Sequence, residues 1–460
     1  MDRRKFLKLT GAAAMAQSSL ALAATPKADA LPQSVQKLSL RIAPLSVELA
    51  PGVTVRTIGY NGQVPGPILR MREGLPVQVD VRNETSNPEL VHWHGLDIGS
   101  RPDGAMEEGS PTIAPGGSLR YSFTPRPAGT RWYHTHTMAR DNLNVATYTG
   151  QYGFLMIEPS SHPGAYDREV FLAVHHWQPM LMRMQEGDET CMGVSYEHAS
   201  FNDKLLGAGE PIRVREGERV LFHFLNASAT EDVVLALPGH RFTILALDGN
   251  PVPNPAPVEV LSLSVAERID AIVEMNSPGV WILGSLKDQE RQSGLGVVLE
   301  YAGREGEPRW IAPASLDWSY LRFGHTGLDD IASFEKHFPE NIFTMIFEKK
   351  TVSDGVDRWT INGKTYDELP PLEVRAGQRY RFRFVNASGC AHPVHLHRHR
   401  FELKRVAQVP TAGVVKDTLN LGRYNVAEAE FVADNPGPTL FHCHQQLHMD
   451  YGFMQLIKYV

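Results

Sequence analysis

Four short histidine clusters carry the residues of this chain that could bind a metal. They hold ten of its nineteen histidines and read HWH at 92–94, HTH at 134–136, HPVHLH at 392–397 and HCHQQLH at 442–448. Each contains an H-x-H pair, and residues i and i+2 of a β-strand point to the same side, so both imidazoles of a pair can face one cavity. Imidazole binds copper, zinc, iron and nickel, so the pairs alone leave the metal open.

Cys443, inside the last pair, narrows the choice of metal. Because it lies between His442 and His444, its thiolate points to the opposite side of the strand and could bind a second, separate ion. With His392 and His448 it makes a set of two imidazoles and one thiolate, which is typical of electron-transfer copper. A lone cysteine is often a small buried apolar residue, but the flanking histidines disfavour that interpretation here.

A repeated pattern sets the register of these clusters. A glycine turn followed by a strand of alternating apolar and polar residues, which ends at an asparagine, occurs three times, at 74–83, 217–226 and 377–386. A second shared turn, ending in glycine, occurs at 127–129, 277–279 and 435–437. Such alternation is typical of half-buried strands, so the chain is predicted to consist of three copies of one all-β module.

The outer two copies carry their H-x-H pairs at equivalent positions. Coincidence is therefore a poor explanation for the four pairs. The middle copy has Leu235 and Leu237, then Gly284 and Leu286, at those positions. We therefore interpret the middle copy as a spacer that holds the other two. Thr135 takes the place of Cys443 in the first copy, so the thiolate centre is expected only in the third.

The repeats predict three Greek-key β-sandwiches in tandem. A chain of 460 residues is too long for one core, because domains usually hold about 100–150 residues. We expect a leader over 1–30, domains over 31–160, 161–305 and 306–460, and breaks near 159–163 and 303–314.

The four motifs together resemble the copper motifs of the multicopper oxidases, including laccases, and the resemblance covers essentially the whole mature chain. It implies cupredoxin-like domains and four copper ions. By this resemblance, type 1 copper binds His392, Cys443 and His448, and type 2 copper binds His92 and His395. The type 3 pair would take His94, His134 and His444 on one ion and His136, His397 and His442 on the other.

The resemblance also implies a reaction. A small reducing substrate would lose one electron at the type 1 site, four times over, while dioxygen is reduced to two waters at the other three ions. Cys443 would touch the first copper while its neighbours His442 and His444 touch the type 3 pair, which leaves a short covalent path for electrons.

Three positions near the motifs vary from the family pattern or add to it. Many relatives have a weak axial methionine ten residues after the cysteine, but here that residue is Phe453, followed by Met454. Phe453 predicts a three-coordinate type 1 site with a raised potential, although plain core packing also explains it. Asp103 matches a family carboxylate near type 2 copper that could supply protons, or is a simple turn residue. Asp450 stands one residue beyond the place where some bacterial relatives carry a glutamate, and its part in proton delivery is left open.

A second group of soft ligands lies outside the motifs. It comprises Met180, Met182, Met184, Met192 and Cys191, with His175 and His176 nearby. Thioethers favour Cu(I), but methionine also fills irregular cores, and we favour core filling. Cys191 could form a disulfide with Cys390, which the sequence alone does not establish. The remaining histidines, including His223, His240 and His399, are interpreted as structural.

The first residues are typical of an export signal. Basic residues at 3–5 and 8 precede an apolar run over 9–24 with small residues at Ala21 and Ala23. Arg3 and Arg4 ahead of Phe6 resemble a twin-arginine signal, so we expect the Tat export machinery as a partner and a periplasmic or secreted product. No later apolar run reaches the roughly 18 residues of a membrane span. The formal net charge of -7 gives no reason to expect nucleic acid as a partner.

Three functions are weighed. The first is a laccase-like oxidase of phenols or aromatic amines, favoured by Phe453 and by the lack of a long methionine-rich insertion. The second is a cuprous or ferrous metallo-oxidase in metal homeostasis, which the methionine group would favour. The third is a non-catalytic cupredoxin scaffold of the cell envelope, which lost ligands would mark, and no motif ligand is missing here.

Overall fold

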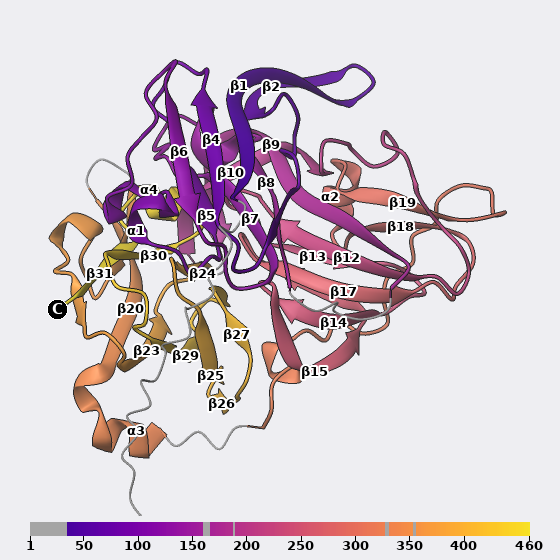
Figure 1. The fold of residues 1–460 in the computed structure, drawn as a ribbon. Helices are drawn as coiled ribbons and strands as arrows, with labels where there is room; N and C mark the ends of the chain where they lie inside the picture. Colours follow the sequence, from indigo (N-terminus) through magenta and orange to yellow (C-terminus); the bar gives the residue numbers. More distant parts are fainter. Residues whose placement is uncertain (1–34, 160–165, 187–188, 327–330, 353–355) are drawn as a thin grey trace, which may run out of the picture. The chain divides into compact units, whose positions relative to one another are not determined.

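The computed structural model describes residues 35–159, 166–186, 189–326, 331–352 and 356–460 (Figure 1). The expected leader over 1–30, with its twin-arginine pair and cleavage site, and most of the expected break at 159–163 lie outside the described residues. The described helices are short: α1 (Ser100–Asp103), α2 (Asp288–Gln292), α3 (Ile331–His337) and α4 (Gln446–Asp450). None of them has the length and apolar character needed to cross a membrane.

The first stretch of chain forms two four-stranded sheets. One has the order β2-β1-β4-β6 and consists of β1 (Gln36–Ala50), β2 (Val53–Tyr60), β4 (Val77–Asn83) and β6 (Ser118–Phe123). The other has the order β3-β8-β7-β5 and consists of β3 (Leu69–Arg72), β5 (Val91–His94), β7 (Gly129–Thr135) and β8 (Tyr152–Glu158). Val79, Trp93 and Leu155 lie in one buried cluster, so the two sheets share a core.

The second stretch forms a six-stranded and a five-stranded sheet. The larger has the order β10-β9-β12-β17-β14-β15, with β9 (Arg168–Glu186), β10 (Glu189–Phe201), β12 (Arg219–Asn226), β14 (Phe242–Leu247), β15 (Asn250–Val258) and β17 (Arg268–Glu274). The smaller has the order β11-β19-β18-β13-β16, with β11 (Ile212–Val214), β13 (Val233–Ala236), β16 (Val260–Leu263), β18 (Val280–Ser285) and β19 (Gly296–Tyr301).

The third stretch forms a seven-stranded and a five-stranded sheet. The larger contains β20 (Ile342–Thr351), β21 (Asp357–Ile361), β23 (Arg379–Asn386), β25 (Phe401–Val406), β26 (Val409–Pro410), β27 (Val415–Lys416) and β29 (Val426–Val432). The smaller has the order β22-β31-β30-β24-β28, with β22 (Leu372–Val374), β24 (His392–Leu396), β28 (Thr418–Leu421), β30 (Thr439–Cys443) and β31 (Met454–Tyr459).

The same pairing pattern recurs in each stretch. The repeated strands β4, β12 and β23 each pair in parallel with the first strand of their stretch, which is β1, β9 and β20 respectively. Each pairs on its other side with an antiparallel strand, β6, β17 or β29. The all-β prediction is confirmed, and we refer to the three stretches as the first, middle and third repeats.

The repeated strands β4 and β12 differ in how many of their residues are buried. Along β4, buried residues alternate with more exposed ones, as the sequence pattern predicts. Along β12, every residue after Arg219 is buried. Leu225 at the end of β12 belongs to a buried cluster with Trp132 and Phe154 of the first repeat, so part of the face that would meet water in an isolated sandwich is covered.

Strand pairing brings the motifs together. β5 pairs with β7 so that His92 lies opposite His134, and β24 pairs with β30 so that His395 lies opposite His442. The first and third repeats meet at these strands, because the rings of His94 and His395 stack with centroids 3.7 Å apart.

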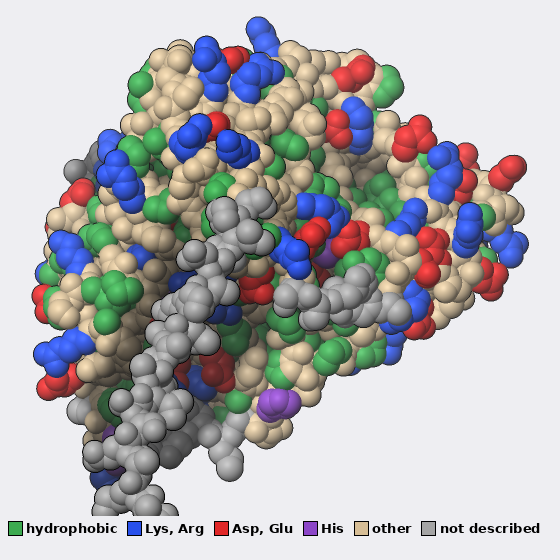
Figure 2. Space-filling model, viewed as in Figure 1, with side chains coloured by type: hydrophobic (Ala, Val, Ile, Leu, Met, Phe, Trp, Pro, Cys, Tyr) green, Lys and Arg blue, Asp and Glu red, His purple; other side chains and the backbone are tan. Residues whose placement is uncertain are grey.

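On the face seen in Figure 2, Lys and Arg side chains are interspersed with Asp and Glu side chains.

Candidate metal centres

Cys443 lies at the end of β30 with two histidines around it. Its Sγ is 3.4 Å from His448 Nδ1 and 3.8 Å from His392 Nδ1, and the two nitrogens are 3.1 Å apart. His392 comes from β24 and His448 from α4, and all three side chains are buried. His392 Nε2 contacts Ser388 Oγ at 2.9 Å, which leaves Nδ1 as the nitrogen that faces the sulfur.

Aromatic side chains surround this cluster. The ring of Trp359 lies 3.9 Å from that of His448, and the ring of Phe453 lies 4.8 Å from that of His392, measured between centroids. Phe453 is fully buried, and its backbone carbonyl accepts a hydrogen bond from Cys443 N at 3.1 Å. The two rings thus give His392 and His448 an apolar boundary.

The other eight motif histidines gather in a second region. Three groups of three have ligand atoms that all lie within 4.8 Å of one another: His92, His94 and His395; His94, His134 and His444; and His136, His397 and His442. Every member is buried. Residues from the first and third repeats contribute to each group, so neither repeat holds a complete set alone.

Hydrogen bonds leave one nitrogen unpartnered in four of these eight rings. Nδ1 of His92, His134 and His395 faces a backbone carbonyl oxygen at 2.9, 2.7 and 2.8 Å respectively. Nε2 of each of these three rings is buried with no hydrogen-bond partner. His94 is reversed, with Nε2 bonded and Nδ1 unpartnered. Buried, unpartnered imidazole nitrogens that converge on one region are what a metal site requires.

Burial also sets the charge of these rings. It lowers the pKa of His392 and His395 to about 3 each, and it lowers the pKa of His94, His134 and His444 well below the usual value, with neighbouring histidines adding to the effect. The rings are therefore neutral at pH 7 and present lone pairs. Burial raises the pKa of the Cys443 thiol, so its ionisation has to be coupled to the arrival of a cation. The donor set fits copper, with neutral imidazoles for all the ions and one thiolate for a separate centre.

Asp103 lies against two of the histidines. Its Oδ2 is 2.8 Å from His397 Nδ1 and 3.1 Å from His92 Nδ1, and the side chain is fully buried. Glu108, which the sequence analysis missed, is also buried and accepts a hydrogen bond from Leu440 N at 2.7 Å. Burial and then the charge of Asp103 raise the pKa of Glu108. Two buried carboxyl groups thus stand beside the histidine cluster.

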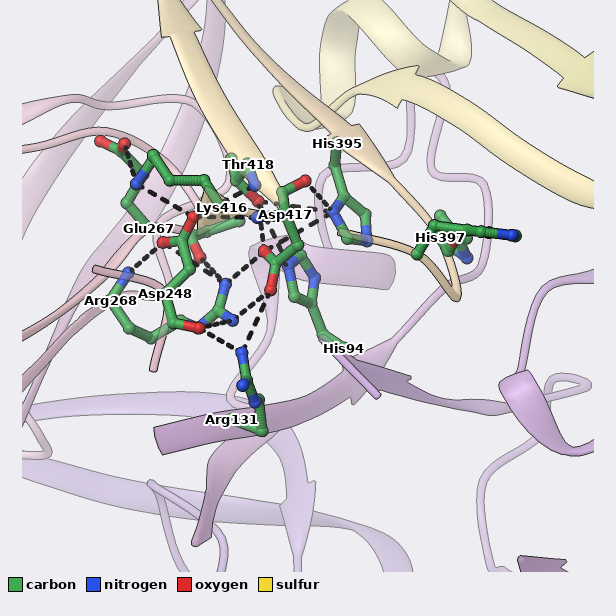
Figure 3. A network of polar contacts seen from close by, with 12 residues as sticks. His94, Arg131, Asp248, Glu267, Arg268, His395, His397, Lys416, Asp417 and Thr418 are labelled. Atoms are coloured by element: carbon green, nitrogen blue, oxygen red, sulfur yellow. Dashed lines mark hydrogen bonds and ion pairs between the residues drawn. The ribbon is translucent and has the colours of Figure 1, made fainter. Parts of the chain in front are cut away.

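Asp417 is the most important residue that the sequence analysis missed (Figure 3). Its Oδ1 accepts a hydrogen bond from His94 Nε2 at 3.0 Å, and its backbone carbonyl accepts one from His395 Nδ1 at 2.8 Å. Asp417 therefore orients one histidine from each outer repeat. A charged pair, Lys416 and Asp417, between two apolar runs is the signal that would have found it.

The middle repeat holds Asp417 in place. Arg268, at the start of β17, donates two hydrogen bonds to the Asp417 carboxylate at 2.7 and 2.5 Å. Asp248 of the same repeat accepts from the backbone N–H of Asp417 and of Thr418, at 3.3 and 3.1 Å, and is 3.0 Å from Lys416 Nζ. The spacer interpretation was thus incomplete, because the middle repeat supplies no histidine to these groups but does bind the residue that orients two of them.

Asp450 lies at the end of α4 and ties it to the chain that follows His136. Its carboxylate accepts hydrogen bonds from Arg140 N at 2.6 Å and from Gln446 Nε2 at 2.8 Å. Burial raises its pKa to about 6. The described contacts of Asp450 are thus with backbone and amide groups.

A pocket of about 280 Å³ opens beside His448. The middle repeat contributes Glu231, Asp232 and Lys287 to its lining, and the hairpin of β9 and β10 contributes Met184, Cys191 and Met192. The third repeat contributes Cys390, Gln445 and Leu447. A small molecule in this pocket would therefore lie against a histidine of the Cys443 cluster.

The methionine group only partly fills a core. Met192 is buried, but Met180 and Met182 are 66% and 43% exposed. The core-filling interpretation is therefore wrong for these two, because they lie on a hairpin that leaves one face open. The other histidines have polar partners: His223 contacts Asp270 at 2.7 Å, His240 contacts Tyr301 at 2.5 Å and His399 contacts Tyr459 at 2.7 Å.

Comparisons with known proteins agree with this geometry. Multicopper oxidase family models match residues 42–162, 186–297 and 341–459. The chain is 29% identical to multicopper oxidase MmcO of Mycobacterium tuberculosis, over 91% of this chain and 86% of that protein. It is 25% identical to Laccase-1 of Botryotinia fuckeliana, over 88% of this chain and 78% of that protein.

A solved structure gives the same result. The multicopper oxidase of Pseudomonas thermotolerans superposes with a TM-score of 0.72 at 26% identity, covering 93% of this chain and all of that one. Three findings lead to one conclusion. Family models match three successive parts of the chain, a relative matches along most of its length, and ten buried histidines gather with one cysteine. The chain belongs to the multicopper oxidase family and is an oxidoreductase that uses oxygen as its acceptor.

Proposed function

We propose that this protein is a laccase-like oxidase that couples four one-electron oxidations of a phenol or an aromatic amine to the reduction of dioxygen to two waters. One observation carries the proposal. Cys443 belongs to the cluster with His392 and His448, while its chain neighbours His442 and His444 belong to two different groups of the second cluster. Electrons taken up at the first cluster would cross to the second through a few covalent bonds.

The residues divide into three roles in this proposal. His392, Cys443 and His448 hold type 1 copper, and His92 and His395 hold type 2 copper. The type 3 pair is held by His94, His134 and His444 on one ion and by His136, His397 and His442 on the other. Bound copper would supply reversible one-electron chemistry, while Asp103 and Asp417 hold the ligand rings in orientation.

The residues that line the pocket beside His448 support the proposal of an organic reductant. Oxidation of a phenol releases a proton with the electron, so a nearby carboxylate assists it. Glu231 and Asp232 line the pocket, and burial raises their pKa values to about 7 and about 6. Both groups can therefore take up a proton near neutral pH.

A cuprous or ferrous metallo-oxidase is the second candidate, and the sulfur atoms of the same pocket favour it. Met184, Met192, Cys191 and Cys390 line the wall beside His448. Soft sulfur ligands suit Cu(I), and the two carboxylates would suit Fe(II).

Oxygen uptake by the copper-loaded protein, with a phenol, Cu(I) and Fe(II) compared side by side, tests the proposal. The laccase-like function requires that the phenol gives the highest kcat/KM. Faster uptake with a metal ion would replace it with the metallo-oxidase. If no donor supports uptake although four copper ions are bound, the non-catalytic scaffold is the right description.

We also propose export by the twin-arginine route, which rests on Arg3, Arg4 and the apolar run over 9–24. Changing both arginines to lysine should keep the chain inside the cell with its leader attached. Fractionation followed by N-terminal sequencing checks this, and unchanged export of the variant would contradict it.

A further inference from the structure

We propose that Cys191 and Cys390 form a disulfide that locks the hairpin of β9 and β10 onto the chain segment before His392, and so holds one wall of the pocket beside His448. The effect on reductant binding rests on the proposed function of that pocket. The bond itself does not. The two cysteines come from the middle and third repeats and are 199 positions apart in the chain.

The two sulfur atoms already lie in contact, with 2.8 Å between Cys191 Sγ and Cys390 Sγ. Both side chains are buried, at 1% and 4% exposure. A disulfide bond is about 2.05 Å long, so the sulfurs have to close by less than about 1 Å to form one. A shift of that size is within the reach of side-chain rotation.

Other contacts dock the hairpin at this place. The Asp357 carboxylate accepts a hydrogen bond from Met192 N at 2.6 Å and pairs with Arg183 Nη1 at 3.3 Å. Lys349 Nζ donates to the backbone carbonyl of Thr190 at 2.8 Å. Residues on both sides of Cys191 are thus held against the third repeat. These contacts between the two repeats bring the two sulfur atoms together.

The segment that carries Cys390 is held as firmly and leads directly to His392. The Cys390 carbonyl accepts a hydrogen bond from Asn386 Nδ2 at 2.8 Å. Ser388 Oγ, in the same turn, contacts His392 Nε2 at 2.9 Å. A bond to Cys390 therefore restrains the turn that orients His392 as well as the pocket wall.

The bond can form by exchange with a small external disulfide that enters the pocket. Lys349 Nζ lies 3.5 Å from Cys191 Sγ, so it favours the thiolate. Cys191 attacks one sulfur of the external disulfide, which releases one thiol and leaves a mixed disulfide. Cys390 then attacks the Cys191 sulfur and releases the second thiol. The protein pair is oxidised by two electrons, the external disulfide is reduced by two, and the two protons leave on the released thiols.

Peptide mapping tests whether the bond forms. The copper-loaded protein is treated with 2-hydroxyethyl disulfide, quenched in acid, unfolded, alkylated and digested without reduction. We expect one joined peptide that contains Cys191 and Cys390 and lacks two hydrogen atoms, while Cys443 is alkylated. Alkylation of all three cysteines would overturn the proposal.

Three variants test what the bond does: Cys191→Ser, Cys390→Ser and the double change. Each should raise KM for the phenol severalfold and should speed amide hydrogen exchange along β10. The double variant should match the single ones, because either change removes the same bond. Effects that add, or unchanged exchange in β10, would overturn the locking role.

The two proposals fail in different ways. The peptide map and the hydrogen exchange need no turnover, so they report on the bond even if no donor supports oxygen uptake. Normal oxygen uptake with a phenol, together with the absence of a joined peptide, would overturn the disulfide proposal and leave the oxidase proposal standing.

Discussion

The guanidinium of Arg268 binds the carboxylate of Asp417 through two hydrogen bonds, of 2.7 and 2.5 Å, although the two residues belong to different repeats. Both side chains are fully buried. Burial would raise the pKa of Asp417, but the charge of Arg268 and its hydrogen bonds outweigh it and hold the pKa low. The ionised carboxylate then accepts from His94, so a residue of the middle repeat acts on the histidine cluster through Asp417.

Removing this guanidinium should destabilise the fold strongly. Arg268→Met leaves a buried carboxylate without its main partner, which costs about 3–5 kcal/mol in the free energy of unfolding. Arg241→Met is the matched control, because Arg241 pairs with Glu259 at 3.0 Å but is 57% exposed, and an exposed pair is worth at most about 1 kcal/mol. Urea unfolding of the copper-free proteins gives both values. Equal losses would show that the Arg268 pair has no special role.

Cys443→Ser should remove the type 1 centre and spare the others. Without a thiolate the intense blue absorption is lost, whereas the histidine cluster should retain about three copper ions per chain. Metal analysis and optical spectra check this. Thr135→Ser, at the equivalent position of the first repeat, should keep the blue absorption. Loss of all copper from Cys443→Ser would mean that the centres do not assemble separately.

Phe453→Met should lower the potential of the type 1 centre. Phe453 is fully buried beside His392, and a thioether in its place offers a weak axial ligand, which stabilises the oxidised ion. A redox titration of the blue absorption measures the change. Phe382→Met, equally buried in the same core, should leave the potential where it is. The axial assignment would fail if the two variants behaved alike.

Asp103→Ala should slow oxygen reduction while the blue absorption stays. The change removes the carboxylate that accepts from His397, and losses of this kind cost about 10- to 100-fold in activity or metal affinity. Asp103→Asn keeps an acceptor oxygen and should lose less. Rapid-mixing measurements of reoxidation by dioxygen separate this step from uptake of electrons. Normal reoxidation in Asp103→Ala would make it a simple turn residue.

Stability should fall in alkaline solution because of His223. Burial lowers its pKa, but Asp270 at 2.7 Å and Glu169 at 3.6 Å outweigh burial and raise the pKa from 6.5 to about 9. The protonated ring stabilises the fold fully below about pH 6.5, and the contribution, about 3 kcal/mol at most, is lost as pH rises through about 9. Urea unfolding between pH 6 and pH 10 checks the slope. His223→Gln should flatten it, and an unchanged slope in that variant would assign it to other groups.

The metal motifs were legible in the sequence because strand geometry is local. Alternation along 77–83 predicts which residues of β4 are buried, and the spacing of His442 and His444 around Cys443 predicts that the cysteine serves a different cluster from its two neighbours. The equivalent positions in the first and third repeats could be found by counting, since the repeats preserve the distances along the chain.

Asp417, Arg268 and the pocket beside His448 could not be found in that way. Asp417 is 323 positions from His94 and 149 positions from Arg268, and no local period relates them. The exposure of Met180 and Met182 likewise depends on what packs against their hairpin.

The sequence by itself determined the all-β class, the repeats and the histidines and cysteine that gather into the candidate metal groups, because a strand places alternate side chains on opposite sides whatever surrounds it. Only the tertiary structure decided which nitrogen of His92, His94, His134 and His395 lacks a hydrogen-bond partner, which carboxylates orient the rings, and that Cys191 meets Cys390 beside the pocket. These features depend on how the repeats pack, and packing joins residues that the chain keeps far apart.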